Sequence, residues 1–429
     1  MGFGTLWSRP FPWLLLAVLL APPGAELSLL LSFLLPLLAY RLTVHPPKGE
    51  EVREALAFVS PFWPLVLLEW AQLLFPYPLL QEGGGWPHLP LTGVVLVLLI
   101  HRLTGVRAPG GQAYWVTLSL LAGVLGAVEV LTGVAFFPHP VRLDGPGQNP
   151  LSLFGGRGYW SAFLALALPL VLAGGRIREG VFLSFLLGLG TVRPALLSAV
   201  LAGVLSGRGW RQKLLWGLLM GLGFSGGYLL GIKAPSLWAG GEGGSLEAHV
   251  GRDTFSTRLV IWEGVLRDLS WRPWLGWGGQ PTSGLYPHYM TEEEFAAFYA
   301  REFGAPLSER GYYVWCPAPG RTWGLALKEE GKEKEEGEEG KGNPWKGIDV
   351  FPPMPAHNLF LHFFGAYGVL GGAYFLVRYL QAAGRGGPMG HALLALFPVA
   401  LFWHPSSKVL LFLFLVLGEA LAQKKSPGG

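Results

Sequence analysis

The sequence contains few cysteines and few charged residues. Cys316 is its one cysteine, so an intramolecular disulfide is excluded and cysteine pairing cannot indicate a redox compartment. Charged residues make up 14% of the 429 residues, whereas about a quarter is usual in soluble proteins. The length alone would allow two or three soluble domains, but this scarcity of charge argues against them.

Hydrophobic residues, by contrast, make up 51% of the chain, and the mean hydropathy is +0.39. Apolar runs near the length that crosses about 30 Å of hydrocarbon predict about twelve transmembrane helices. These runs are residues 6–21, 25–40, 54–75, 89–103, 113–134, 158–174, 180–192, 194–206, 213–232, 357–380, 390–403 and 407–422. The expected fold class is therefore an all-α polytopic membrane protein.

The distribution of Lys and Arg over the short loops predicts the orientation. One side holds Arg9, Arg41, Lys48, Arg53, Arg102, Arg107, Arg176, Arg178, Arg208, Arg211, Lys213, Arg378, Arg385, Lys424 and Lys425. The other side holds only Arg142, Arg157, Arg193 and Lys408. Because basic loops are retained in the cytoplasm, both termini are expected to be cytoplasmic in a multi-pass protein of the cytoplasmic (inner) membrane.

The same pattern predicts the domain organisation. Residues 1–232 would hold the first nine helices, residues 233–356 one large external loop, and residues 357–429 the last three helices. Within the loop, Lys328–Gly342 is a low-complexity charge run, which is typical of a solvated insert. The loop carries most of the candidate chemistry.

A helix is predicted inside this loop. Ser256 or Thr257 can cap its start, and Pro273 follows its end. Glu263 and Arg267 are four residues apart, as in a surface ion pair on a helix.

Arg258 lies on the other face of this predicted helix, toward the membrane domain. At 100° per residue it shares that face with Trp262, Val265 and Leu269. An arginine on an apolar stripe either binds an anion, or extends its charge to the interface or pairs with a carboxylate there. The residues alone leave both interpretations open.

A further helix is predicted from near His357. The residues expected on the face of His357 are Leu361, Gly365, Gly368 and Gly372. Glycine stripes let membrane helices pack closely, so His357 would lie over a packed face at the external mouth. It could act there as a general base or as a structural hydrogen-bonding group. His362 points elsewhere, and its spacing from His357 does not suit a metal pair on a helix.

Two further arginines are expected at external helix starts. Arg193 lies in a short turn just before Pro194, which can open the next helix. Arg157 occupies an equivalent position in the run FGGRGYW. For each of them the alternative to anion binding is an interfacial arginine that only extends toward water.

Taken together, these motifs resemble the O-antigen ligase and polymerase superfamily. The resemblance rests on Arg258 followed by Trp262, on Trp274–Gly279 (WLGWGG), and on Ala356–Asn358 before a glycine-rich helix. The runs FGGRGYWSAFLALALPL and TVRPALLSAVLAG resemble two further segments of that superfamily in the expected order. The resemblance covers about Phe154 to Gly372.

The resemblance implies a metal-independent membrane glycosyltransferase with a GT-C-like fold. Such an enzyme moves a glycan from undecaprenyl pyrophosphate to a hydroxyl of a glycolipid, glycan or protein acceptor, at the external membrane face. Arg193 and Arg258 would neutralise the pyrophosphate, with Arg157 able to share that role, and His357 would orient or deprotonate the acceptor. No metal, no other cofactor and no nucleic acid is implied, and the chain has no Asp-x-Asp pair.

The sequence departs from the family pattern at two of these positions. Val192 and Pro194 flank Arg193, where the family usually has Ser or Thr before the arginine and a small residue after it. The run GGRG around Arg157 replaces an Asn-rich pattern. The assignment of Arg193 is therefore weaker than that of Arg258 or His357.

Several other functions were weighed against a ligase. A surface polysaccharide polymerase and a protein O-oligosaccharyltransferase would use the same donor, so these motifs do not separate them from a ligase. A transporter or flippase predicts a polar path through the bilayer and two related halves. Neither is visible, and Glu69 and Glu129 are the only carboxylates well inside the predicted spans. A scaffold would give no reason for an arginine on an apolar stripe.

Overall fold

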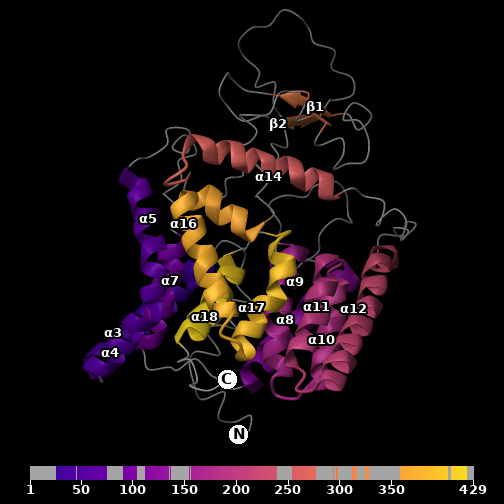
Figure 1. The fold of residues 1–429 in the computed structure, drawn as a ribbon, viewed down its shortest axis with the longest axis horizontal. Helices are drawn as coiled ribbons and strands as arrows, with labels where there is room; N and C mark the ends of the chain where they lie inside the picture. Colours follow the sequence, from indigo (N-terminus) through magenta and orange to yellow (C-terminus); the bar gives the residue numbers. More distant parts are fainter. Residues whose placement is uncertain are drawn as a thin grey trace, which may run out of the picture.

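The fold is a bundle of helices with one helix, α14 (Thr254–Trp271), lying across one end of it (Figure 1). The computed structural model describes residues 26–44, 46–74, 90–103, 112–134, 136, 154, 156–238, 254–276, 293, 296–297, 312–315, 324–327, 358–403 and 407–422. The end that carries α14 is called the α14 end below, and the other is called the opposite end.

Three consecutive parts of the chain form the bundle. The first part contains α3 (Glu26–Val44), α4 (Gly49–Val59), the 3-10 turn η1 (Ser60–Phe62), α5 (Trp63–Leu74), α7 (Pro90–Leu103) and α8 (Gln112–Thr132). The middle part contains α9 (Arg157–Leu172), α10 (Ile177–Leu189), α11 (Pro194–Ser206) and α12 (Trp210–Trp238). The last part contains α16 (Leu359–Ala383), α17 (Gly387–Ala400) and α18 (Ser407–Ala422).

These helices coincide with the predicted apolar runs, except the run at residues 6–21, which lies outside the described residues. Such runs fold as helices because a helix satisfies every backbone N–H and C=O group without water. Four segments of the described chain are long and apolar enough to cross a membrane: Gly49–Gln72, Trp115–Thr132, Trp210–Ala234 and Leu359–Ala383. The predicted class of helical membrane protein is confirmed at this level, and the number of twelve spans stays a prediction.

Several boundaries differ from the predicted ones. The helix predicted at residues 54–75 begins at Gly49, and α12 continues to Trp238, past the predicted loop start at residue 233. Hydropathy marks where apolar sequence ends, but a helix can continue beyond that point. The loop also contains a small antiparallel pair of strands, β1 (Tyr312–Trp315) and β2 (Gly324–Leu327), which the sequence analysis did not predict.

Helix α9 forms the centre of the bundle. Every residue from Trp160 to Leu172 is buried, so the helix is apolar on all sides. The Trp160 indole Nε1 donates a hydrogen bond to the Ala122 carbonyl of α8 at 3.1 Å, which satisfies its one polar atom. The first turn of α9 is therefore held in a rigid frame, and that turn contains Arg157.

Helices α10 and α12 pack against each other through glycine. A Cβ atom at Gly227 would overlap the backbone carbonyl of Phe185, and one at Gly231 would lie 2.6 Å from the carbonyl oxygen of Leu189. These contacts advance in the same direction along both helices, so α10 and α12 are parallel and begin at the same end. The absence of a side chain is what permits this backbone contact.

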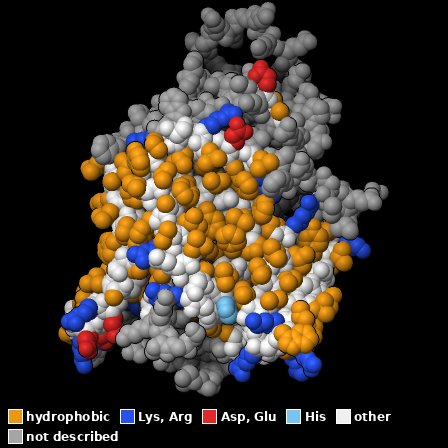
Figure 2. All heavy atoms as spheres, viewed as in Figure 1, with side chains coloured by type: hydrophobic (Ala, Val, Ile, Leu, Met, Phe, Trp, Pro, Cys, Tyr) orange, Lys and Arg blue, Asp and Glu red, His pale blue; other side chains and the backbone are white. Residues whose placement is uncertain are grey.

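The turns that join α9 to α10, α11 to α12 and α16 to α17 lie at the opposite end (Figure 1). These turns and the helix starts that follow them contain most of the described basic residues that were predicted for the cytoplasmic side: Arg176, Arg178, Arg208, Arg211, Lys213 and Arg385. Figure 2 shows a broad apolar surface on the visible face, with many of the Lys and Arg side chains near its lower border. The membrane orientation itself stays a prediction.

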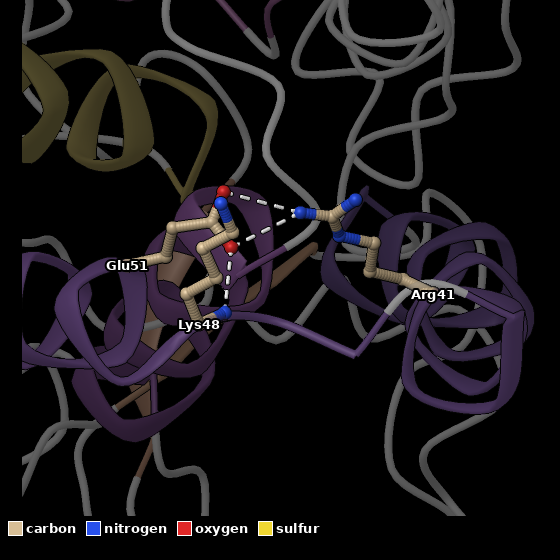
Figure 3. Close-up of polar contacts among 3 residues, drawn as sticks. All are labelled: Arg41, Lys48 and Glu51. Atoms are coloured by element: carbon tan, nitrogen blue, oxygen red, sulfur yellow. Dashed lines mark hydrogen bonds and ion pairs between the residues drawn. The ribbon is translucent and has the colours of Figure 1, made fainter.

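The corner between α3 and α4 shows how charges are arranged at the opposite end (Figure 3). Nη2 of Arg41 donates to both carboxylate oxygens of Glu51, at 3.2 and 3.1 Å. The same carboxylate accepts a 2.9 Å hydrogen bond from the backbone N–H of Lys48, at the start of α4. Glu51 thus joins the end of one helix to the beginning of the next.

Candidate functional site

The predicted face of Arg258 is confirmed by the packing of α14. Val265 is fully buried, and the half-buried Arg258 points toward the end of α17. The Arg258 Cζ atom lies 5.6 Å from the ring centroid of Phe402 and 5.8 Å from that of Trp403. Trp262 lies 6.0 Å from Phe402, centroid to centroid, on the same side. A guanidinium at these distances interacts favourably with aromatic faces.

The outer face of α14 is also as predicted, whereas its start is not. Nη2 of Arg267 donates to Glu263 at 2.6 Å, as an exposed ion pair with i,i+4 spacing. The helix begins at Thr254, so the prediction that Ser256 or Thr257 caps it is wrong. Several serines and threonines in a row each suit a cap, and local propensity does not choose among them.

Arg157 reaches the same region from the first turn of α9. Its Nη1 donates to the Thr191 hydroxyl at 3.0 Å. Its Nε atom is buried and has no hydrogen-bond partner among the described residues. Within that part of the chain, this half-buried guanidinium therefore has one neutral partner and no carboxylate.

Trp403 joins the Arg157 segment to Arg258. A Cβ atom at Gly158 would overlap the Trp403 indole, so glycine permits this contact. The ring of Tyr159 lies 6.3 Å from that of Trp403, edge to face. One side chain on the turn after α17 thus contacts residues next to Arg157 and lies within cation–π distance of Arg258.

Arg193 lies near Arg157 but in a different environment. It precedes Pro194 at the start of α11, as predicted, and its side chain is exposed. Thr191, the hydroxyl partner of Arg157, is two residues earlier and has a positive φ of 55°. The turn therefore brings both arginines to the α14 end, with Arg157 half-buried and Arg193 exposed.

His357 lies outside the described residues, but its neighbour Asn358 is firmly anchored. Asn358 caps α16: its Oδ1 accepts hydrogen bonds from the backbone N–H groups of Phe360 and Leu361, at 2.9 and 3.0 Å. Its Nδ2 donates to the Leu401 carbonyl at 3.0 Å. Residue 358 is thus attached two residues from Trp403, and α16 begins at Leu359 rather than near His357.

The predicted glycine stripe on α16 is wrong, because the helix is kinked. Gly368 has φ 69° and ψ −174°, which interrupts the helix after Tyr367. Leu361 and Gly365 precede the kink and Gly372 follows it, so they do not form one continuous face. Gly368 provides a backbone conformation that other residues avoid.

The turn after α14 docks on this kink. The backbone N–H of Val369 donates to the Pro273 carbonyl at 2.6 Å. Gly276 has a φ of 66°, and a Cβ there would lie 2.4–2.6 Å from the backbone of Ala366 and Gly368. The run WLGWGG thus begins with a backbone-to-backbone contact, which sequence periodicity does not reveal.

A third segment closes this contact. The side chain of Gln72 on α5 donates to the Leu275 carbonyl and, at 2.6 Å, to the Ala366 carbonyl. The fully buried Glu69, one turn earlier, accepts hydrogen bonds from the backbone N–H groups of Leu91 and Thr92, at 3.1 and 2.7 Å. It also accepts from the Thr92 hydroxyl at 2.6 Å and from the Tyr367 hydroxyl at 3.0 Å. This buried carboxylate joins α5, α7 and α16.

The residues that connect these parts could not be identified from the sequence. Phe402 and Trp403 end an apolar run, and aromatic residues at such positions are common in membrane proteins. Thr191 and Gln72 carried no local signal, because their partners are distant in sequence. Only an approximate arrangement of the helices could have indicated them.

The arrangement suits an anionic group more than a metal ion. Arginines converge from α9, α11 and α14 toward one end of the bundle, around the Thr191 and Trp403 turns. Guanidinium groups bind phosphate oxygens through parallel N–H donors. Among the described residues, no three His, Cys, Asp or Glu side chains are grouped as a metal site would require.

Comparison of the chain with protein-family models, with curated proteins and with solved structures gives no match. The resemblance to the O-antigen ligase and polymerase superfamily therefore stays a prediction that rests on the motifs.

Proposed function

We propose that this protein is a membrane glycosyltransferase of the O-antigen ligase type. It would transfer a glycan from undecaprenyl pyrophosphate to an acceptor hydroxyl at the external face of the cytoplasmic membrane. The observation that carries the proposal is the half-buried guanidinium of Arg157: its Nε is buried without a partner, and its hydrogen-bond partner in the described chain is a neutral hydroxyl. Burying part of a cation without an anion is unfavourable, so such a group favours an anionic ligand.

The surroundings of Arg157 support a large, doubly charged ligand. Trp403 links its segment to Arg258, and Arg193 follows Thr191 by two residues. A pyrophosphate presents several oxygens to more than one arginine. A donor whose lipid tail stays in the bilayer would reach these residues at the end of the helices, which agrees with their position beside α14.

The proposed reaction requires charge stabilisation at the leaving group. The acceptor oxygen attacks the anomeric carbon of the glycan, and the bond from that carbon to the phosphate oxygen breaks. Negative charge then develops on the departing undecaprenyl pyrophosphate, where Arg157, Arg193 and Arg258 would stabilise it. His357 would accept the proton from the acceptor hydroxyl. This scheme uses neither a metal nor a covalent intermediate.

The remaining features of the proposal concern the membrane. We infer twelve spans, a GT-C-like arrangement, cytoplasmic termini and an external loop at residues 233–356. The Lys and Arg bias of the short loops supports this orientation.

A transfer assay in EDTA tests the proposal. The full-length protein would be reconstituted in vesicles with a glycan on undecaprenyl pyrophosphate and supplied with candidate acceptors. We expect product from the wild type, and at least a ~100-fold lower initial rate from Arg258→Ala and from His357→Ala, because each removes a group needed in the transition state.

Arg267→Ala is the matched control on the same helix. It removes an arginine that points away from the bundle and pairs with Glu263, so its rate should stay near that of the wild type. Wild-type rates in both Arg258→Ala and His357→Ala would overturn the site. Glycan lengthening without an added acceptor would identify a polymerase, and transfer to a protein an O-oligosaccharyltransferase. Substrate movement across the vesicle without transfer would identify a transporter.

A further inference from the structure

A cluster of exposed cations lies at the opposite end of the bundle, far from the candidate site. Two neighbouring helix starts carry it, those of α10 and α12. Its members, called the basic edge below, are Arg176, Arg178, Arg208, Arg211 and Lys213, and all five side chains are exposed. Glu179 pairs with Arg176 at 3.5 Å and is the one carboxylate among these residues. The edge therefore has a strong net positive charge.

The backbone that carries the basic edge is well ordered by local contacts. The N–H of Arg208 donates to the side-chain oxygen of Gln212 at 3.0 Å, which fixes the turn before α12. The N–H of Lys213 donates to the Gly209 carbonyl at 2.9 Å, and a Cβ at Gly207 would lie 2.7 Å from the Lys213 backbone nitrogen. Because α10 and α12 are parallel, both groups of cations project from the same end.

Three other described arginines at this end are engaged within the protein. Arg41 pairs with Glu51, and Arg102 pairs with Glu419. Arg385 donates to the backbone carbonyls of Ala420 and Leu421. In contrast, within the described parts of the chain no carboxylate pairs with Arg178, Arg208 or Lys213. The basic edge thus differs from these three arginines by presenting its charge to an external partner.

An apolar stripe begins directly at the basic edge and follows α12. Trp210, Leu214, Leu218 and Leu222 recur every four residues and are 68%, 63%, 61% and 61% exposed. The Arg211 guanidinium lies 5.4 Å from the centre of the Trp210 ring. Tryptophan is typical of the membrane interface, and exposed leucines beyond it suit acyl chains. A soluble acidic partner would give no reason for this stripe.

We propose that the basic edge and the α12 stripe together form a binding site for an anionic phospholipid. The cations contact the phosphodiester headgroup, and the leucines contact its acyl chains. Cationic side chains near an anionic leaflet attract its headgroups, and basic surfaces between membrane helices bind anionic lipids. This site is separate from the arginines at the α14 end and does not depend on the proposed glycan transfer.

Fluorescence anisotropy tests the proposal with defined lipids. The full-length protein in neutral detergent would be titrated into phosphatidylglycerol, or into phosphatidylcholine, each labelled on an acyl chain. We expect tighter binding of phosphatidylglycerol, about tenfold weaker binding in the double variant Arg208→Ala/Arg211→Ala, and weakening of wild-type binding by high salt. The variant Arg208→Lys/Arg211→Lys keeps the charge and should keep most of the affinity.

The matched control is Lys48→Ala/Arg53→Ala, which removes two exposed cations from the α4 segment at the same end. Its affinity for phosphatidylglycerol should stay near the wild-type value. Equal affinity for the two lipids, no effect of salt, or equal losses in the two double alanine variants would overturn the proposal. Retention of polyglutamate without a preference for phosphatidylglycerol would assign the edge to an acidic protein instead.

Discussion

Arg41 and Arg102 at the opposite end and Arg157 at the α14 end have different kinds of partner. At the opposite end, Arg41 and Arg102 contact the carboxylates of Glu51 and Glu419. At the α14 end, the hydrogen bond described for Arg157 goes to the Thr191 hydroxyl. A hydroxyl positions a guanidinium but leaves its charge in place, whereas a carboxylate neutralises it. Whether the charge of an arginine stays available to a ligand therefore depends on the chemistry of its neighbours.

The ends also differ in how the backbone is joined. At the α14 end, Gly276 and Gly368 let the turn after α14 contact the kink of α16 directly. At the opposite end, Gly386 adopts nearly the same backbone conformation in an open turn, with φ 69° and ψ −162°. One end is therefore held by contact between distant segments, and the other by local turns.

The largest effect is expected from alanine at Gly368, and alanine at Gly386 serves as the comparison. Gly368→Ala should lower the free energy of unfolding by about 4 kcal/mol, because it adds backbone strain and overlaps the Trp274 carbonyl. Gly386→Ala adds the strain alone, since nothing lies within 4 Å of its Cβ position, and should cost about 1–2 kcal/mol. Unfolding in detergent measures both. Equal losses would show that the docked turn adds nothing to stability.

The next prediction compares arginines from the two ends in the transfer assay. Arg157→Ala should lower the initial rate by about a hundredfold, as expected for losing one group that stabilises the leaving charge. Arg157→Lys should retain part of the rate. Arg102→Ala should leave the rate within about threefold, because Arg102 pairs with Glu419 and lies over the Phe58 ring at the other end. A wild-type rate in Arg157→Ala would remove Arg157 from the site.

A smaller effect is expected from two glutamines. Gln72→Leu should cost about 2 kcal/mol, because the carbonyls of Leu275 and Ala366 lose their side-chain donor in a part-buried position. Gln381→Leu should cost less than about 0.5 kcal/mol, because the exposed Gln381 only accepts from Arg378. Thermal unfolding in the same detergent measures the difference. Similar midpoints for the two variants would contradict the role of Gln72.

The smallest effects are expected where exposed arginines pair with carboxylates. Arg267→Ala on α14 and Arg41→Ala at the opposite end should each cost about 0.5–1 kcal/mol or less, because both pairs are partly or fully exposed to solvent. High salt should reduce both effects. A loss of unfolding free energy above about 2 kcal/mol in either variant would show that surface ion pairs, and not only the docked turn, contribute strongly to the stability of one end.

Much of the fold could be predicted from hydropathy alone. The apolar runs at residues 25–40 and 113–134 became α3 and α8, because a run with only one charged residue has few alternatives to a helix in hydrocarbon. The faces of α14 could also be predicted, since one helix period separates Arg258 and Val265 from Glu263 and Arg267. These features depend on neighbouring residues in the sequence.

The kink at Gly368 could not be predicted in this way. It depends on the turn at residues 273–276 and on Gln72, which lie far away in the sequence. A continuous helix through Gly368 would place the glycines on one face, but the kink at Gly368 interrupts that face. A glycine in a helix can permit close packing or adopt a positive φ, and the sequence alone does not show which of the two it does.

The candidate site was predicted in part. Arg258 was found from its position on an apolar stripe, but Arg157 and Arg193 had the same local pattern, a cation at the start of a helix. The structure separates them, because Thr191 and the contact of Gly158 with Trp403 enclose the Arg157 segment while Arg193 is exposed. The burial of a side chain depends on tertiary contacts, which the local sequence does not show. His357 stays a prediction, since it lies outside the described residues.

The two anchors at Gly276 and Asn358 have a consequence for the segment between them. Gly276 is attached through Ala366 and Gly368, and Asn358 through the Leu401 carbonyl, so both ends of residues 277–357 are attached by groups outside that segment. The free energy of closing such a segment grows only with the logarithm of its length. A change in the length of residues 277–356 should therefore cost little stability and leave Arg258 and Trp403 in their places.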